Sequence, residues 1–291
     1  MSMSPAIQAK ARQLLEEGEV TCVIGYEVGP RGQTRPAFVR RPEEAERLVW
    51  NQSCTHNLVT YLRRWTAPPQ AKERTRLGVV VKPCDSRALN VLLAESQIER
   101  DRVHLIGVVC EGVIDISTGD AQSRCRTCAT RVPLVYDSLI GEETAVAAGS
   151  EVGRPDGDVE WLRKMEAMSP AQRAEFWLGE FDRCLRCYAC RQVCPMCSCP
   201  TCLYERDDSL WVGMGIGLNE KRAYHLGRAW HLAGRCIGCN ECERVCPVHI
   251  PIRLLNRTLA LAVEGAFGHR AGMAPVPSPL LTLLVAQGGE P

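Results

Sequence analysis

The sequence lacks the features typical of membrane, nucleic-acid-binding and secreted proteins. No run of 18 apolar residues occurs among its 291 residues, so we expect no membrane insertion. The 35 Lys and Arg residues nearly balance the 34 Asp and Glu residues, and a net charge of +1 argues against a nucleic-acid partner. The N-terminus has no unbroken apolar core of a secretory signal. We therefore expect a cytoplasmic protein with one large domain or two modest ones.

Fingerprints of nucleotide binding and of hydrolytic catalysis are also missing. No GxGxxG motif follows a predicted strand, and the glycine-rich stretch 213–217 has no P-loop lysine. The six histidines are scattered, and neither a Ser/His/Asp arrangement nor a pair of catalytic carboxylates is visible. The sequence therefore predicts no catalytic residue and indicates no residues for a flavin site.

Cysteine, in contrast, is abundant, with 17 in the chain. Disulfide frameworks are typical of short secreted chains, whereas this chain is long and shows no secretory signal. Eleven of the cysteines lie in the 63 residues from Cys184 to Cys246. The cysteines therefore predict metal binding in a reducing compartment.

The cysteine-dense segment contains an internal repeat. Residues 184–195 read CLRCYACRQVCP and residues 236–247 read CIGCNECERVCP, at an offset of 52. Each copy has the spacing C-x2-C-x2-C-x3-C-P, in which three looped cysteines can face one cubic cluster and the proline turns the chain after the fourth. Zinc also takes four thiolates, but its sites usually show CxxC pairs set well apart.

The repeat predicts two 4Fe-4S clusters with crossed ligands. In proteins with two such clusters, the fourth cysteine of each motif binds the cluster of the other motif. The ligands expected for cluster 1 are Cys184, Cys187, Cys190 and Cys246, and those expected for cluster 2 are Cys236, Cys239, Cys242 and Cys194. Residues 184–265 resemble the bacterial two-cluster ferredoxins, which implies an α+β domain.

The segment departs from the simplest ferredoxins in two respects. The 41 residues between Cys194 and Cys236 leave room for an inserted helix, predicted over 219–233 with Ala223, Leu226 and Trp230 on one side. Three further cysteines follow the first motif. They are Cys197, Cys199 and Cys202. Three interpretations of these cysteines are open: a cysteine-rich loop beside a cluster, a fourth cluster or a zinc site. If they bind metal, Cys54 is the best candidate for the fourth ligand.

The first half of the chain predicts a third cluster. The apolar runs 77–81 and 104–109 are separated by a helical pattern at 85–95, which indicates two parallel neighbouring strands. Cys84 and Cys110 follow these strands and should meet at one sheet edge, where open α/β sheets place ligands. Cys125 and Cys128 could complete a third 4Fe-4S site. The alternative is that Cys84 and Cys110 pack as small hydrophobic residues.

Residues 10–135 also resemble a second family, the beta subunits of deazaflavin-reducing hydrogenases and related dehydrogenases. The resemblance rests on KPCDSRAL, GVVCEG, LLEEGEVTCVIGYEV and FVRRPEEAERLVW. It implies a 4Fe-4S cluster on the four cysteines of the first half, and electron transfer inside a larger complex. Members often bind flavin. The family's longer C-terminal portion is shortened here, so FAD is not carried over with the cluster.

We therefore predict an α/β N-terminal domain with a partly parallel sheet at 1–150, a helical connector at 151–183, the ferredoxin-like domain at 184–265 and a tail at 266–291. The predicted function is an iron–sulfur electron-transfer subunit of a multi-subunit oxidoreductase of anaerobic metabolism, of the formate dehydrogenase, hydrogenase or heterodisulfide reductase type. Two alternatives are a flavin enzyme that reduces a small electron carrier and an iron–sulfur regulatory protein.

Overall fold

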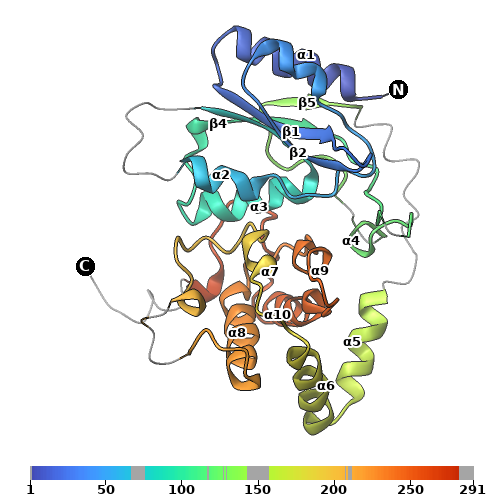
Figure 1. Ribbon diagram of the computed structural model, residues 1–291, viewed down its shortest axis with the longest axis vertical. Coiled ribbons are helices and arrows are strands. Elements are labelled where there is room, and N and C mark those ends of the chain that lie inside the picture. Colours follow the sequence, from blue (N-terminus) through green and yellow to red (C-terminus); the bar gives the residue numbers. More distant parts are fainter. Residues whose placement is uncertain are drawn as a thin grey trace. The chain divides into compact units, whose positions relative to one another are not determined.

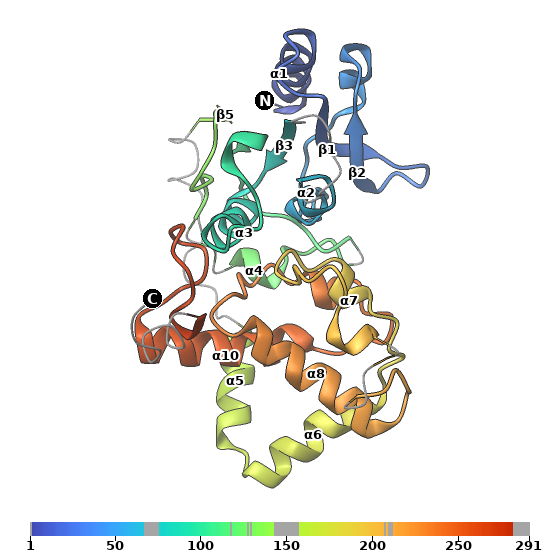
Figure 2. The same cartoon turned by 90° about the vertical axis from the view of Figure 1, so that its left-hand side faces the viewer.

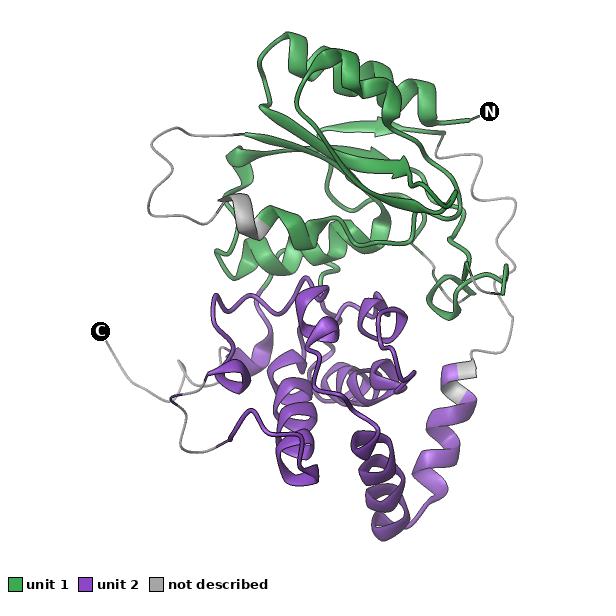
Figure 3. Cartoon of the chain, in the orientation of Figure 1, with its two compact units in different colours: residues 1–154, 272–276 green, residues 155–271, 277–291 purple. Residues whose placement is uncertain are grey.

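A computed structural model describes residues 2–66, 76–116, 118–126, 128, 130–142, 157–206, 208 and 212–281. The chain forms two compact units (Figure 3). Unit 1 comprises Met1–Arg154 and Gly272–Val276, and unit 2 comprises Pro155–Ala271 and Pro277–Pro291. The last part of the expected tail, 282–291, and the start of the expected connector, 151–156, lie outside the described residues.

Unit 1 is built on a five-stranded sheet with the order β2-β1-β3-β4-β5. Only β2 runs antiparallel to its neighbour, so the sheet is mixed and mostly parallel, as predicted. Every residue of β3 and β4 is buried, which fits strands with both faces covered. The strands are β1 (Cys22–Val28), β2 (Thr34–Val39), β3 (Leu77–Val81), β4 (Val103–Val108) and β5 (Ser138–Ile140).

Helices cover both faces of this sheet (Figure 1). Helix α1 (Ser4–Glu16) lies on one face, and α2 (Val59–Thr66) and α3 (Pro83–Ala94) lie on the other. The sequence Lys82-Pro83 starts α3 directly after β3, because proline is favoured in the first helical turn. The remaining short helices of unit 1 are η1 (Pro42–Arg47), η2 (Arg100–Arg102) and α4 (Ser123–Arg126).

Unit 2 contains helices and loops in the residues that the structure describes. We expected an α+β domain here, but the described residues of this unit contain no strand. The cysteine motifs form tight left-handed turns and one-turn helices instead of extended chain. The elements are α5 (Gly157–Ala167), α6 (Pro170–Asp182), α7 (Ala189–Gln192), η4 (Leu203–Glu205), α8 (Leu218–Leu232), α9 (Glu241–Arg244) and α10 (Ile252–Phe267). None of the described helices is long and apolar enough to cross a membrane.

The inserted helix α8 packs against α6 and α10 (Figure 2). The helix occurs where it was predicted, but its buried side is not the apolar one. Leu226 and Trp230 are 37% and 73% exposed, whereas Tyr224 and Arg228 are almost completely buried. The polar residues can be buried because unit 2 offers sulfur atoms and backbone carbonyls as their partners.

Candidate metal centres

The two cysteine motifs have the same local backbone structure. Arg186 and Tyr188 in the first copy have positive φ angles of 52° and 59°, and their counterparts Gly238 and Asn240 have 69° and 56°. One-turn helices follow at matching positions, α7 in the first copy and α9 in the second, and these helices contact each other. The sequence repeat is therefore also a structural repeat, and each copy turns its cysteine loop in the same way.

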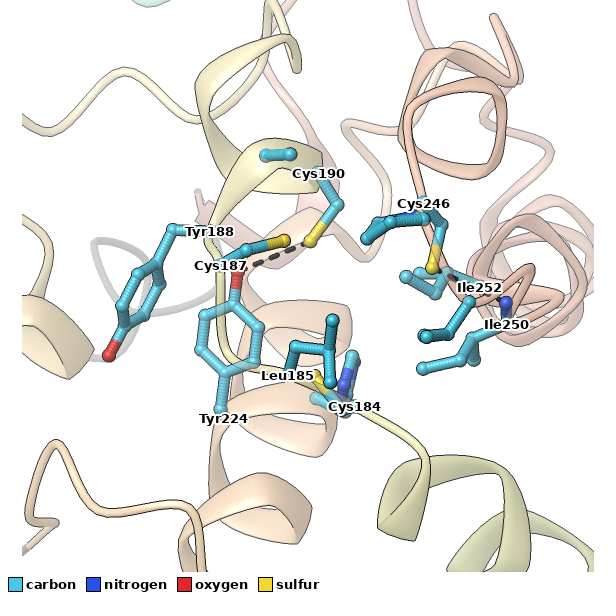
Figure 4. A pocket seen from close by; sticks show the side chains of 13 residues that line it. Cys184, Leu185, Cys187, Tyr188, Cys190, Tyr224, Cys246, Ile250 and Ile252 are labelled. Atoms are coloured by element: carbon cyan, nitrogen blue, oxygen red, sulfur yellow. Dashed lines mark hydrogen bonds between the residues drawn. The ribbon is translucent and has the colours of Figure 1, made fainter.

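Cysteines from both copies line one pocket of unit 2 (Figure 4). Three come from the first copy and the fourth, Cys246, comes from the end of the second. Apolar side chains, among them Ile250 and Ile252, complete the lining. The four cysteines of this pocket are Cys184, Cys187, Cys190 and Cys246. The structure thus brings together the set that the repeat predicts for cluster 1.

Three of these sulfur atoms have hydrogen-bond donors nearby. The backbone N–H groups of Arg186 and Ile250 each lie 3.3 Å from a sulfur, that of Cys184 and that of Cys246 respectively. The hydroxyl of Tyr224 lies 3.3 Å from Cys190 Sγ (Figure 4). Donors in these positions suit thiolate sulfur, which accepts hydrogen bonds when it is bound to iron.

For the set predicted for cluster 2, electrostatic effects link Cys194 of the first copy to the second copy. Burial raises the pKa of Cys242 to about 12, and the thiolate charge of Cys236 is among the further causes. A hydrogen bond with Cys197 and burial raise the pKa of Cys194, and the charge of Cys239 from the other copy raises it further. Cys194 therefore lies within electrostatic range of the second motif.

Thiolates are the ligands of 4Fe-4S clusters and also of zinc sites. In the described part of the chain, no three His, Cys, Asp or Glu side chains are grouped closely enough to hold one metal ion. A cubic cluster needs a wider spacing, because each of its four irons takes one thiolate. Burial also raises the pKa of Cys190, so this thiol would release its proton when iron binds. All 17 cysteines are free of disulfides.

The extra cysteines of the first motif do not behave alike. Cys197 lies against Cys194, and the hydrogen bond between them is the main cause that lowers its pKa to about 5, with Arg228 and Arg191 adding to the effect. Cys199 is exposed, and Cys202 is partly buried beside the core of unit 2.

Cys54 belongs to unit 1, where its buried thiol lies 3.8 Å from the carbonyl oxygen of Val49. A further metal site that joins Cys54 to the extra cysteines of the first motif stays a prediction.

The four candidate cysteines of unit 1 come from neighbouring parts of the fold. Cys84 lies in the first turn of α3 after β3, and Cys110 follows β4, which pairs with β3 in parallel. Burial raises the pKa of Cys110 to about 11, and the charges of Cys125 and Cys128 contribute to the same effect. A Cβ at Gly112 (φ +119°) would meet the Cβ of Cys125 at 3.4 Å, so glycine lets the chain pass this cysteine closely.

A buried ion pair beside Cys84 was not predicted from the sequence. Lys82 Nζ lies 3.0 Å from the carboxylate of Asp85, and these side chains are 1% and 0% exposed. The same ammonium donates to the backbone oxygen of His56 at 2.6 Å and to the hydroxyl of Tyr26. Burial lowers the pKa of Lys82, but the charges of Asp85 and Cys84 and the hydrogen bond to Asp85 together outweigh burial and leave the pKa raised. In the sequence, the only indication of this ion pair was that two residues of opposite charge flank Pro83 and Cys84.

The comparisons with known proteins match part of unit 2 to an iron–sulfur family. A family model described as a 4Fe-4S binding domain matches residues 231–252, which contain the second cysteine motif. The C-terminal half therefore contains a 4Fe-4S binding domain. The F420-dependent formate dehydrogenase subunit beta of Methanocaldococcus jannaschii is 22% identical over 364 aligned positions, which cover 96% of this chain and 94% of the relative.

A second relative extends the resemblance. It is the F420-dependent formate dehydrogenase 1 subunit beta of Methanococcus maripaludis, 21% identical across 95% of this chain and 92% of the relative. Both alignments are longer than the 291 residues of this chain, so the relatives contain segments that it lacks. The resemblance to this beta-subunit family and the expected iron–sulfur electron-transfer function in an oxidoreductase are confirmed.

Proposed function

We propose that this chain is the iron–sulfur relay subunit of a cytoplasmic formate dehydrogenase-type complex of anaerobic metabolism, and that it binds three 4Fe-4S clusters. The observation that carries the proposal is the pocket in which Cys246 joins three cysteines from the other end of the dense segment. The beta subunits that resemble this chain support the type of complex. When bound, each cluster supplies a site that takes up and releases one electron.

The protein's own residues bind these clusters and control access to them. The crossed sets hold clusters 1 and 2, and Cys84, Cys110, Cys125 and Cys128 hold the third cluster. Ile250 and Ile252 exclude water from the inner side of the cluster 1 pocket, whereas Cys187 on its outer side is exposed. We infer that cluster 1 exchanges electrons with another subunit, because electron transfer requires close approach.

The crossed ligation is tested by comparing two serine variants of the full-length protein, purified without oxygen. Cys187→Ser should change the ligand set and the spectrum of cluster 1, whereas Cys194→Ser should change those of cluster 2. Electron paramagnetic resonance (EPR) spectra of the reduced protein distinguish these outcomes. If both substitutions damage the same cluster alone, the crossed arrangement is wrong.

The third cluster is tested by iron analysis. We expect about twelve irons per chain in the wild-type protein and about four fewer in Cys110→Ser. A Cys22→Ser variant is the matched control, because Cys22 is a buried thiol of β1 outside the proposed ligand sets. Equal iron content in Cys110→Ser and the wild-type protein would remove the third cluster from the proposal.

The relay role itself is tested by turnover. The isolated chain should accept electrons from a strong artificial reductant but should not oxidise formate or hydrogen, because its sequence contains no arrangement of catalytic residues. Robust turnover by the single chain, or flavin released from it by acid, would favour the flavin-enzyme alternative.

A further inference from the structure

We propose that the inserted helix α8 sets the reduction potentials of both ferredoxin-type clusters. Tyr224 acts as a hydrogen-bond donor to cluster 1 alone, and Arg228 acts as a buried cation shared by clusters 1 and 2. The inference rests on the proposed function, because it needs both clusters to be present. It assigns a role to the insertion that separates the two cysteine motifs.

Tyr224 is buried, and its hydroxyl contacts a cysteine of the cluster 1 set. Its side chain is 1% exposed, and its hydroxyl lies 3.3 Å from Cys190 Sγ. A free thiol could donate to the hydroxyl, but a sulfur that is bound to iron as thiolate can only accept. The hydroxyl must then donate to Cys190, and a hydrogen bond of this kind withdraws charge from the cluster and makes its reduction easier.

Arg228 lies one helical turn after Tyr224, on the same side of α8. It is 4% exposed, and its guanidinium donates to the carbonyl oxygen of Cys190 at 2.9 Å. Its charge acts on cysteines of both predicted sets, namely Cys190, Cys194 and Cys242, and on the extra cysteine Cys197. One cation therefore serves two candidate clusters.

The guanidinium also has a donor without a partner. Arg228 Nε is buried and makes no hydrogen bond among the residues that the structure describes. An unsatisfied buried N–H is costly and indicates an acceptor that the protein alone does not supply. The sulfur atoms of an iron–sulfur cluster are acceptors of the right kind, since hydrogen bonds to cluster sulfur are a recognised means of tuning its potential.

The direction of the effect follows from electrostatics. Reduction adds one negative charge to a cluster, and a nearby positive charge stabilises that reduced state. The stabilisation is larger in a buried site than in water, because the surroundings screen the charges less. Loss of Arg228 should therefore lower both potentials, whereas loss of the Tyr224 hydroxyl should lower that of cluster 1 only.

The test is a redox titration, monitored by EPR, of the intact protein with all clusters bound. We expect Tyr224→Phe to shift cluster 1 to a more negative potential and to leave cluster 2 unchanged. Arg228→Gln should shift both clusters in the same direction. Arg228→Lys keeps the charge and should shift them less than Arg228→Gln does. Iron content of each variant shows whether the clusters are retained.

Two matched controls separate this mechanism from general effects. Arg222→Gln removes an exposed cation from the same helix, and Tyr136→Phe removes the hydroxyl of an exposed tyrosine of unit 1. Both should leave the potentials unchanged. This inference alone is overturned if both clusters are intact in Tyr224→Phe and Arg228→Gln but their potentials do not change. It is also overturned if the control variants shift the potentials by the same amount. A wild-type protein without two clusters overturns the proposed function and this inference together.

Discussion

The buried ion pair of unit 1 allows a quantitative prediction about Lys82→Met. The substitution leaves the carboxylate of Asp85 in a site that is 0% exposed and without its countercharge at 3.0 Å. Breaking a buried pair by removing one partner typically costs about 3–5 kcal/mol. The backbone oxygen of His56 also loses a donor. We therefore expect the segment around β3 and the first turn of α3 to open about 10²–10⁴-fold more often.

Hydrogen exchange measured by mass spectrometry is the suitable assay, because it reports local opening and does not require both units to unfold together. Peptides from the segment 77–90 should exchange faster in Lys82→Met by the predicted factor. Adding Asp85→Asn removes the unpaired charge, so the double variant should exchange more slowly than Lys82→Met alone.

An exposed pair supplies the control for this experiment. Lys164 pairs with Glu160 at 3.0 Å, but both side chains are 68% exposed. Exposed pairs of this kind contribute only about 0–1 kcal/mol, so Lys164→Met should change exchange very little in its own helix. If Lys82→Met has as small an effect on β3 as Lys164→Met has on α5, our argument about the buried charge is refuted.

Three further predictions concern unit 2. Burial lowers the pKa of His225 to about 3, so the stabilising contribution of neutral His225 is complete above pH 6.5 and is lost as the pH falls towards 3. Between these values, the free energy of unfolding obtained from thermal unfolding should fall by a slope approaching about 1.4 kcal/mol per pH unit. The His225→Phe variant should lack this slope. Gly227→Ala should lower the unfolding temperature, because the new Cβ would overlap the Tyr204 hydroxyl, whereas Gly265→Ala has free space and should not. Ser169→Ala should cost about 0.5–2 kcal/mol in urea unfolding, because it removes the cap of α6; no loss would contradict the capping box.

The sequence predicts the local parts of this protein well. The spacing of the cysteines determines where the loops turn and where the short helices α7 and α9 begin, so the structural repeat follows the sequence repeat. The order strand, helix, strand around Cys84 was sufficient to predict two parallel neighbouring strands. Ser169 and Gln172 mark the start of α6 because the capping box involves only adjacent residues.

Features that depend on distant partners were not predictable in the same way. The sequence places Leu226 and Trp230 on one apolar side of α8, yet Trp230 is exposed and Arg228, on another side, is buried. Periodicity indicates that a helix exists, but the partners available in the folded unit decide which side is buried. The same limit applies to Lys82, whose burial depends on Tyr26 and His56, residues far away in the chain.

The meeting of Cys184 and Cys246 in one pocket has a consequence for assembly. A cluster bound there would link the two ends of a 63-residue segment. Like a disulfide cross-link, it would reduce the conformational entropy of the unfolded chain. Neither motif could complete its own ligand set, so iron loading of the two sites should be mutually dependent. Removing iron from one site with a chelator would loosen the loop that positions the other. We expect the two clusters to be lost together, in a single cooperative step.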